Sequence, residues 1–385
     1  MKQQKNIPAL RFPGFTGEWE QKKLGEICKM QAGKFVNATE IMEMSDDNLY
    51  PCYGGNGLRG FTKSFNQDGK HSLIGRQGAH CGNINLANGK YYATEHAIVV
   101  NLITGLDTEF MFYVLNNLNL NQYSTGLAQP GLSVQNLEKV EITISPALSE
   151  QQKIAAFLTA VDEKLQSLKQ QKALLEQYKK GVMQQLFTGQ LRFKDAKGKD
   201  FPDWEEKQLG EVCEILMCKR IFSEETSEFG EIPFYKIGTL GSQPDSFISR
   251  ELFERYKNKY NYPEKGEVLI TCSGTVGKCI PFNGEDAYFQ DSNIVWLSNP
   301  SLKISNNFLY YVLSNINWGK LNSTTITRIY GADLRNLSIK YPRMQEEQTA
   351  IAQFLSTLDN KIAHTQQQIT QTEQWKKGLL QQLFV

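Results

Sequence analysis

The strongest constraint on the fold is a single apolar stripe through residues 149–187, whose members recur at steps of mostly four and three. This period keeps one face of a helix toward a partner helix. Ser149 with Gln152 predicts a capping-box start, and Thr188 with Gly189 predicts the end of the helix. A helix of about 38 residues would be nearly 60 Å long, so it needs a partner along its length. The stripe, which skips Lys172, consists of Ile154, Leu158, Val161, Leu165, Leu168, Leu175, Tyr178, Val182 and Leu186.

The partner is a second copy of the same helix in the same chain. The sequence EQQKIAAFL at 150–158 returns as EQTAIAQFL at 347–355, and the register then holds without a gap to the end of the chain. Gly181 and Gly378 recur at equivalent places, although each costs about 1 kcal/mol relative to alanine inside a helix. We therefore expect another backbone to come close to both glycines. The second stripe consists of Ile351, Leu355, Leu358, Ile362, Thr365, Ile369, Thr372, Trp375, Leu379 and Leu383.

The repeat extends beyond the helices. WEQKKLGEIC at 19–28 matches WEEKQLGEVC at 204–213, and the Leu-Arg-Phe at 10–12 matches that at 191–193. The second helix ends the chain, and the counterpart of the segment after the first helix stands at the beginning, so the sequence reads as if circular. We predict an α+β fold in which two mixed α/β domains (1–148 and 189–345) are joined by two long antiparallel helices (149–188 and 346–385). These helices form a coiled coil with a pseudo-two-fold axis, the domains at its opposite ends and the termini close together.

Composition supports folded domains in a reducing compartment. Hydrophobic residues make up 40% of the chain and charged residues 22%, which argues against disorder. No apolar run approaches the ~18 residues of a membrane span, and the polar start is not a secretory signal. The seven cysteines show no paired spacing, so we expect a cytoplasmic protein without a disulfide framework. The net charge of +1 neither supports nor excludes nucleic acid binding.

Each predicted domain contains short apolar strands, one amphipathic helix and glycine-rich loops. Strands are predicted at 73–74, 97–102, 267–271 and 293–297, helices at 109–116 and 307–314, and loops at 53–60, 75–78 and 273–277. None of the loops makes a convincing catalytic motif. The run 272–278 lacks the first glycine of a phosphate-binding loop, and the glycines at 55, 57 and 60 lack a strand-turn-helix context. The four histidines lack metal or triad spacing, so no catalytic or metal site is predicted.

The two copies differ most at the tips of equivalent loops. Aligning Gly78 with Gly274 places Arg76 and Gln77 opposite Cys272 and Ser273, within a framework that otherwise agrees. A loop that reads two different targets would keep its frame and change its tips. Arginine and glutamine can make bidentate contacts to guanine and adenine edges in the major groove. The alternative is that these are solvated loop residues that have drifted.

Basic and polar residues near these loops suit phosphate anchoring beside base contacts, although charge runs are often only a solvated surface. Tyrosines such as Tyr53 and Tyr235 interleave with them. The predicted DNA-binding residues are Asn56, Arg59, Lys63, Arg76, Gln77 and His80 in the first domain, and Lys219, Arg220, Lys236, Ser273, Thr275, Lys278, Thr325 and Arg328 in the second.

Taken together, the motifs resemble the specificity subunit of type I restriction-modification enzymes. The resemblance rests on the Trp-Glu-x-x-x-Leu-Gly-Glu openings at Trp19 and Trp204, the Glu-Gln-x-x-Ile-Ala-x-Phe-Leu helix starts and the Lys-Gly-x-x-Gln-Gln-Leu-Phe helix ends. It implies two target-recognition domains, each reading one half of a bipartite duplex DNA site, and a coiled coil that sets the gap. It also implies a subunit without catalysis of its own.

The resemblance further implies that the chain recruits two modification subunits, which methylate adenine, and two ATP-driven restriction subunits. S-adenosylmethionine, ATP and Mg²⁺ are then expected on those partners and no cofactor on this chain. We expect the glutamines Gln184, Gln185, Gln381 and Gln382 of the two long helices to contact the modification subunits. Two alternatives remain open: a DNA-modifying enzyme with unrecognised catalytic residues, and a coiled-coil scaffold whose globular ends bind peptide or sugar.

Overall fold

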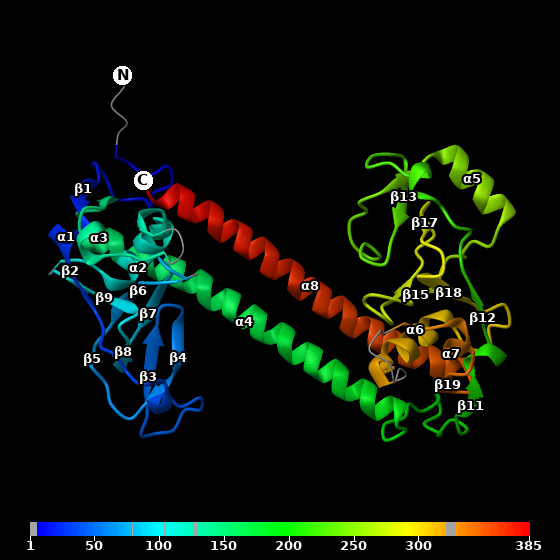
Figure 1. The fold of residues 1–385 in the computed structure, drawn as a ribbon. Helices are drawn as coiled ribbons and strands as arrows, with labels where there is room; N and C mark the ends of the chain where they lie inside the picture. Colours follow the sequence, from blue (N-terminus) through cyan, green and yellow to red (C-terminus); the bar gives the residue numbers. More distant parts are fainter. Residues whose placement is uncertain (1–5, 79, 104, 127–129, 321–327) are drawn as a thin grey trace. The chain divides into compact units, whose positions relative to one another are not determined.

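A computed structural model describes residues 6–78, 80–103, 105–126, 130–320 and 328–385 (Figure 1). The chain forms two compact units. Unit 1 comprises Met1–Gln171 and Thr365–Val385, and unit 2 comprises Lys172–His364. Two long helices, α4 (Leu148–Phe187) and α8 (Gln345–Leu383), each contribute one segment to both units. The long helices predicted at 149–188 and 346–385 are therefore present, with starts one residue earlier.

Unit 1 is built on two four-stranded sheets and one two-stranded sheet. The first sheet has the antiparallel order β2-β9-β6-β7, the second has the order β4-β3-β8-β5 with β3 and β8 parallel, and β1 pairs with β10. Helix α2 packs on β6 and β7. The elements are β1 (Glu20–Lys23), α1 (Leu24–Ile27), β2 (Cys28–Ala32), η1 (Ala38–Glu40), β3 (Tyr50–Gly54), β4 (Gly57–Thr62), β5 (Gln67–Asp68), β6 (His71–Gly75), β7 (Ile84–Ala87), β8 (Lys90–Ala93), β9 (Ala97–Leu102), α2 (Thr108–Asn117), η2 (Leu120–Tyr123), α3 (Val134–Leu137) and β10 (Glu141–Ile144).

Unit 2 repeats this plan with different details. Its sheets have the orders β12-β18-β15-β16, β14-β13-β17 with β13 and β17 parallel, and β11-β19. The helix α5 is an addition between β14 and β15. The elements are β11 (Glu205–Gln208), η3 (Leu209–Glu211), β12 (Glu214–Leu216), η4 (Ser223–Glu225), β13 (Ile232–Tyr235), β14 (Phe247–Ile248), α5 (Arg250–Lys259), β15 (Val268–Thr271), β16 (Cys279–Pro281), β17 (Tyr288–Phe289), β18 (Ile294–Ser298), α6 (Asn306–Ser314), η5 (Trp318–Lys320), α7 (Gly331–Arg335) and β19 (Ser338–Tyr341).

The mixed α/β composition predicted for both domains is confirmed. The predicted amphipathic helices lie within α2 and α6, and the strands predicted at 73–74 and 97–102 lie within β6 and β9. The strands predicted at 267–271 and 293–297 overlap β15 and β18 but begin one residue too early. The glycine-rich stretch 53–60 was predicted to be a loop, but it forms most of a β-hairpin. Gly54 pairs with Gly57 across a two-residue turn, and Gly57 has a φ of 92°. A left-handed residue beside such a turn lets the strands keep their twist, and glycine supplies it without strain.

Within each unit the segments of α4 and α8 run antiparallel. In unit 1, Phe157 contacts Trp375, and Leu165 and Leu168 pack with Ile369. Later residues of α4 therefore contact earlier residues of α8. In unit 2 the end of α4 packs in one core with the start of α8, around Leu186 and Ile351. The predicted antiparallel pairing of the long helices is confirmed.

The apolar stripes are correct except at two aromatic positions. Tyr178 and Trp375 remain 54% and 52% exposed, whereas the polar Thr365 is buried on the seam. The lysines one residue later, Lys179 and Lys376, reach the neighbouring helix and form ion pairs there. At these two places the lysine, one residue after the aromatic residue, takes the position on the seam. A lysine can do so because its aliphatic stem covers apolar surface while its ammonium group pairs with a carboxylate.

Two local helix predictions are wrong. Ser149 is not the N-cap, because α4 already begins at Leu148 and the buried Ser145 instead accepts a hydrogen bond from the Ala147 amide at 3.2 Å. Gly181 and Gly378 do not mark a close approach of backbone: apart from neighbouring residues of the same helix, no described atom comes within 4 Å of a Cβ built on either residue. Their recurrence has no explanation in the packing of the described chain.

The circular character of the repeat is visible in equivalent hydrogen bonds. In unit 1 the Leu10 amide donates to the Gln382 carbonyl at 2.9 Å, and in unit 2 the Leu191 amide donates to the Gln185 carbonyl at 3.1 Å. The N-terminal segment therefore continues the last helix in space as residues 188–193 continue the first helix in sequence. Leu10 thus lies beside the end of the last helix within unit 1. Residues 1–5, on which the predicted closeness of the two termini depends, lie outside the described residues.

Candidate nucleic-acid interface

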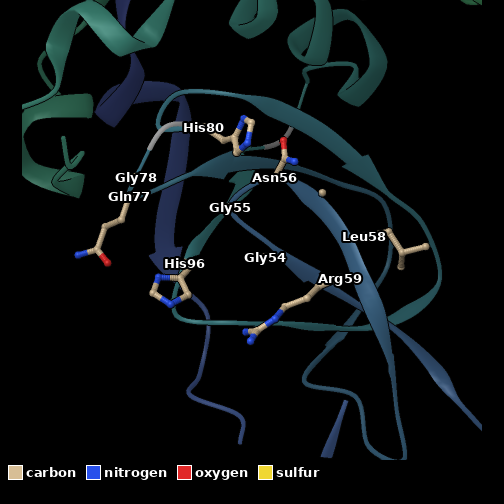
Figure 2. A pocket seen from close by; sticks show the side chains of 10 residues that line it. Gly54, Gly55, Asn56, Leu58, Arg59, Gln77, Gly78, His80 and His96 are labelled. Atoms are coloured by element: carbon tan, nitrogen blue, oxygen red, sulfur yellow. The ribbon is translucent and has the colours of Figure 1, made fainter. Parts of the chain in front are cut away.

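A pocket of about 490 Å³ in unit 1 lies between the β3–β4 hairpin and the segment after β6 (Figure 2). Four of the residues predicted to bind DNA line it: Asn56, Arg59, Gln77 and His80. His96, just before β9, completes the polar lining. Figure 2 shows Arg59 and His96 on one side of the pocket, with Asn56 and His80 on the other.

The local fold explains why these side chains meet. Gly55 sits so close to the chain before β9 that an added Cβ would lie 3.2 Å from the His96 carbonyl oxygen, and Gly75 allows no Cβ against the Gly55 carbonyl. These close approaches press the hairpin against the end of β6. Asn83 links the hairpin to the segment after β6, because its Nδ2 donates to Asn56 Oδ1 at 3.2 Å and contacts His80 Nδ1 at 3.4 Å.

Two predicted residues of unit 1 do not line this pocket. Lys63 is exposed just after β4. Arg76 is only half-exposed, and its Nη1 lies 3.5 Å from the Glu95 carbonyl oxygen. Their assignment to DNA binding stays a prediction.

A second pocket, of about 360 Å³, lies in unit 2 and includes Arg220 and Lys236 of the predicted set. Both cations have acidic neighbours. Arg220 Nε lies 3.0 Å from Asp291 Oδ2, and Lys236 Nζ lies 2.9 Å from Asp245 Oδ1. Gln290 adds a buried Oε1 atom that accepts no hydrogen bond within the described chain.

The two pockets occupy the same place in the repeated fold. The Thr94 amide donates to Tyr53 at the end of β3, and the Gln290 amide donates to Tyr235 at the end of β13, each at 2.9 Å. Gly54 and Lys236, which follow these tyrosines, line the first and second pocket respectively.

The alignment of the two loops agrees with their backbone bonds. The Arg76 amide donates to the His96 carbonyl at 2.8 Å, and the Cys272 amide donates to the Asn293 carbonyl at 2.7 Å. Arg76 and Cys272 then accept from Leu132 and from Ile329, respectively. The residue before Ile329 is Arg328, in the place that Gly131 holds in unit 1. Each unit therefore has one arginine at this junction. In unit 1 it is Arg76, just after β6, and in unit 2 it is Arg328, in the segment before α7.

The other predicted residues of unit 2 surround this junction or lie apart from it. Ser273 donates to Asn293 Oδ1 at 2.8 Å, Thr275 is exposed on the same loop, and Lys278 Nζ donates to the Leu240 carbonyl at 2.5 Å. Lys219 stacks over the Tyr260 ring at 5.6 Å. Thr325 lies outside the described residues.

Burial and charge at this junction act on the pKa of the Cys272 thiol in opposite directions. Burial raises its pKa to about 11, against a smaller lowering by the positive charge of Arg328. The other six cysteines also have raised pKa values because of burial, and all seven are free thiols. A nucleophilic role needs a lowered thiol pKa, and none of the seven thiols has one.

Sequence reasoning missed several residues of the two pockets. His96 and Asp291 were passed over because neither lies in a glycine-rich tip. Leu58 and Phe222 line the two pockets while remaining 56% and 52% exposed. Exposed apolar residues beside cationic ones are a usable signal in a sequence only when the strand boundaries are known.

The glutamines predicted to contact partner subunits are all exposed. They lie in the last turns of α4 and α8: Gln184 and Gln185 in unit 2, and Gln381 and Gln382 in unit 1. Across the described ranges, no group of three or more histidine, cysteine or acidic side chains could hold a metal ion. No helix in the described part of the chain is both long and apolar enough to cross a membrane.

Comparison with protein families decides the relationship that the motifs suggested. The family model of the type I restriction modification DNA specificity domain matches the chain twice, over residues 16–177 and 202–374. The chain belongs to this family. The two matches correspond to the two copies of the repeat, which confirms the family resemblance seen in the sequence.

Specificity subunits of other bacteria match the chain, one over nearly its whole length and another over part of it. A putative type I restriction enzyme specificity subunit of Haemophilus influenzae is 35% identical over 94% of this chain and 93% of its own length. The Escherichia coli EcoprrI specificity subunit is 45% identical over 40% of this chain and 38% of its own length. The crystal structure of the type I S subunit from M. genitalium has the same fold, with a TM-score of 0.72 at 19% identity, covering 98% of this chain and 99% of that one.

Proposed function

We propose that this chain is the DNA sequence-recognition subunit of a type I restriction-modification complex. Each of its two globular domains (1–148 and 189–345) reads one half of a bipartite duplex site, and the paired helices set the gap between the halves. The observation that carries the proposal is the double match to the DNA specificity domain, once for each copy of the repeat. The different chemistry of the two equivalent pockets supports two different half-sites.

In this proposal the chain recruits two modification subunits and two restriction subunits in the cytoplasm. It performs no chemistry itself: S-adenosylmethionine, ATP and Mg²⁺ bind to the partners. The exposed glutamines Gln184, Gln185, Gln381 and Gln382, duplicated at the ends of α4 and α8, are the proposed contacts for the modification subunits.

Base-resolution methylation mapping tests this function. A host without adenine methylation would carry the modification subunits with or without this chain. We expect methylation only when the chain is present, confined to one bipartite sequence with an unspecified gap. Methylation that is independent of the chain would contradict the proposal.

A second experiment separates a reader from an enzyme. The purified chain alone would be incubated with duplex DNA, S-adenosylmethionine, Mg²⁺ and ATP. We expect neither methyl transfer nor cleavage until the partner subunits are added. Turnover by the chain alone would mean that catalytic residues have gone unrecognised.

A further inference from the structure

We propose that Arg59 is a specificity-determining residue that reads a guanine in the half-site recognised by unit 1. The inference rests on the proposed function, because it assumes that this unit contacts duplex DNA. It goes further by naming one base, one side chain and the group of atoms that make the contact.

The hydrogen-bonding groups of Arg59 and Asn56 suit a base edge that carries acceptors. Arg59 presents only donors, and within the described ranges it has no ion-pair partner. Asn56 lies on the opposite side, and its Oδ1 already accepts from Asn83, which leaves its amide group available to donate. The major-groove edge of guanine offers two acceptors, N7 and O6, and arginine meets both with parallel N–H groups. The guanidinium of Arg59 therefore matches the major-groove edge of guanine.

The equivalent pocket of unit 2 differs from this one, because acceptors surround its arginine. There Arg220 is engaged by Asp291, and the buried Gln290 Oε1 adds another acceptor. Carboxylate and amide oxygens suit the exocyclic amine of cytosine or adenine. Because the frames are equivalent, the difference lies in the side chains themselves, as expected for two half-sites of different sequence.

Arg59 also lies in a more accessible position than Arg76. Arg59 is exposed on the β4 arm of the hairpin, next to the exposed Leu58. Arg76 is held back against the Glu95 carbonyl and does not line the pocket. An apolar side chain beside an arginine can contact a thymine methyl group while the arginine meets guanine. Arg59, more than Arg76, has the freedom to reach a base edge.

The test compares Arg59→Lys with Lys63→Ala in the complete complex with its modification subunits. Lysine keeps the positive charge but loses the paired N–H groups. We expect Arg59→Lys to lower discrimination at one G·C pair of the first half-site by about tenfold or more, with the second half-site unchanged. Base-resolution methylation mapping and competition binding with duplexes altered at single positions measure this.

Lys63→Ala serves as the matched phosphate-contact variant. It lies just beyond the same strand but outside the pocket, so we expect affinity to fall equally for all sequences. If Arg59→Lys also lowers affinity evenly, or leaves recognition unchanged, the guanine assignment is wrong although the chain still recognises DNA. If the wild-type complex showed no preference for any DNA sequence, the proposed function itself would be wrong. Thermal unfolding of both variants shows that they are folded.

Discussion

Lys376 of α8 lies 2.5 Å from Asp162 of α4, and the same carboxylate accepts a hydrogen bond from the Tyr113 hydroxyl of α2 at 2.9 Å. The arrangement returns in unit 2, where Asp359 of α8 accepts from Lys179 of α4 at 2.5 Å and from Tyr311 of α6 at 2.8 Å. One aspartate thus joins both long helices to a helix of the globular domain. We call each set of three residues a clamp.

Removing a clamp carboxylate should loosen the attachment of a domain to the helices. We expect Asp162→Ala to destabilise unit 1 by about 1–2 kcal/mol, because the hydrogen bonds are charge-assisted but the aspartate is partly exposed. Chemical denaturation measures the loss, and Asp359→Ala should show a similar loss in unit 2. A double-mutant cycle with Tyr113→Phe tests the coupling; strictly additive effects would mean that the hydroxyl contributes independently of the carboxylate.

Glu150 should make the stability of unit 1 depend on acid pH. Burial alone would raise its pKa, but hydrogen bonds from Arg11 and Ser145 outweigh burial and lower it. Because the folded-state pKa lies below the unfolded value of about 4.3, the stabilisation is present above that pH and is lost as the pH falls through the folded-state pKa. We expect Glu150→Gln to cost roughly 1–3 kcal/mol at pH 7 and less at low pH.

Denaturation of wild type and variant between pH 7 and pH 3 measures this difference. Glu347→Gln is the matched variant, because Glu347 pairs with Arg192 at 2.9 Å in unit 2 as Glu150 pairs with Arg11 in unit 1. An equal loss for Glu150→Gln at every pH would show that Glu150 acts through packing and not through its charge.

Exchange of one globular domain should change one half-site. Replacing residues 20–148 with the corresponding segment of a family member that has another target keeps the helices and the segment before Glu20. We expect methylation mapping to show a new first half-site, with the gap and the second half unchanged. If both halves changed together, the assignment of one half to each domain would be wrong.

The long helices should determine the gap. Inserting one four-residue helical unit into both α4 and α8 lengthens each helix by about 6 Å. We expect the gap in the methylated sequence to grow while the bases read stay the same. Retention of the original gap in the methylation map would exclude the helices as the spacing element.

Much of this architecture follows from periodicity and repetition. The stripe around Leu158 and Leu165 requires a partner helix, and the gapless second copy provides one. The correspondence of Leu10 with Leu191 requires that the chain close on itself, and the hydrogen bonds to Gln382 and Gln185 show that it does. These features are local or internal to the sequence, so no tertiary information is needed to find them.

The candidate site was predicted less completely. Arg59 and Gln77 were found because basic and polar loop tips stand out. His96 joins them only through the pairing of β3 with β8, and Asp291 joins Arg220 in the second pocket only through the pairing of β13 with β17. Tyr178 and Trp375 were placed on the seam by their apolar character, whereas neighbouring lysines take part in the clamps. Choices of this kind depend on which partner atoms are within reach.

The amino-acid sequence alone therefore determined the doubled plan, the two long helices and the membership of the family, because each is written as a repeated spacing of residue types. Only the tertiary structure decided which side chains meet in each pocket and which of their hydrogen-bonding groups stay available. Such groups become neighbours through the pairing of distant strands, and a one-residue change of register would turn different side chains toward the pocket.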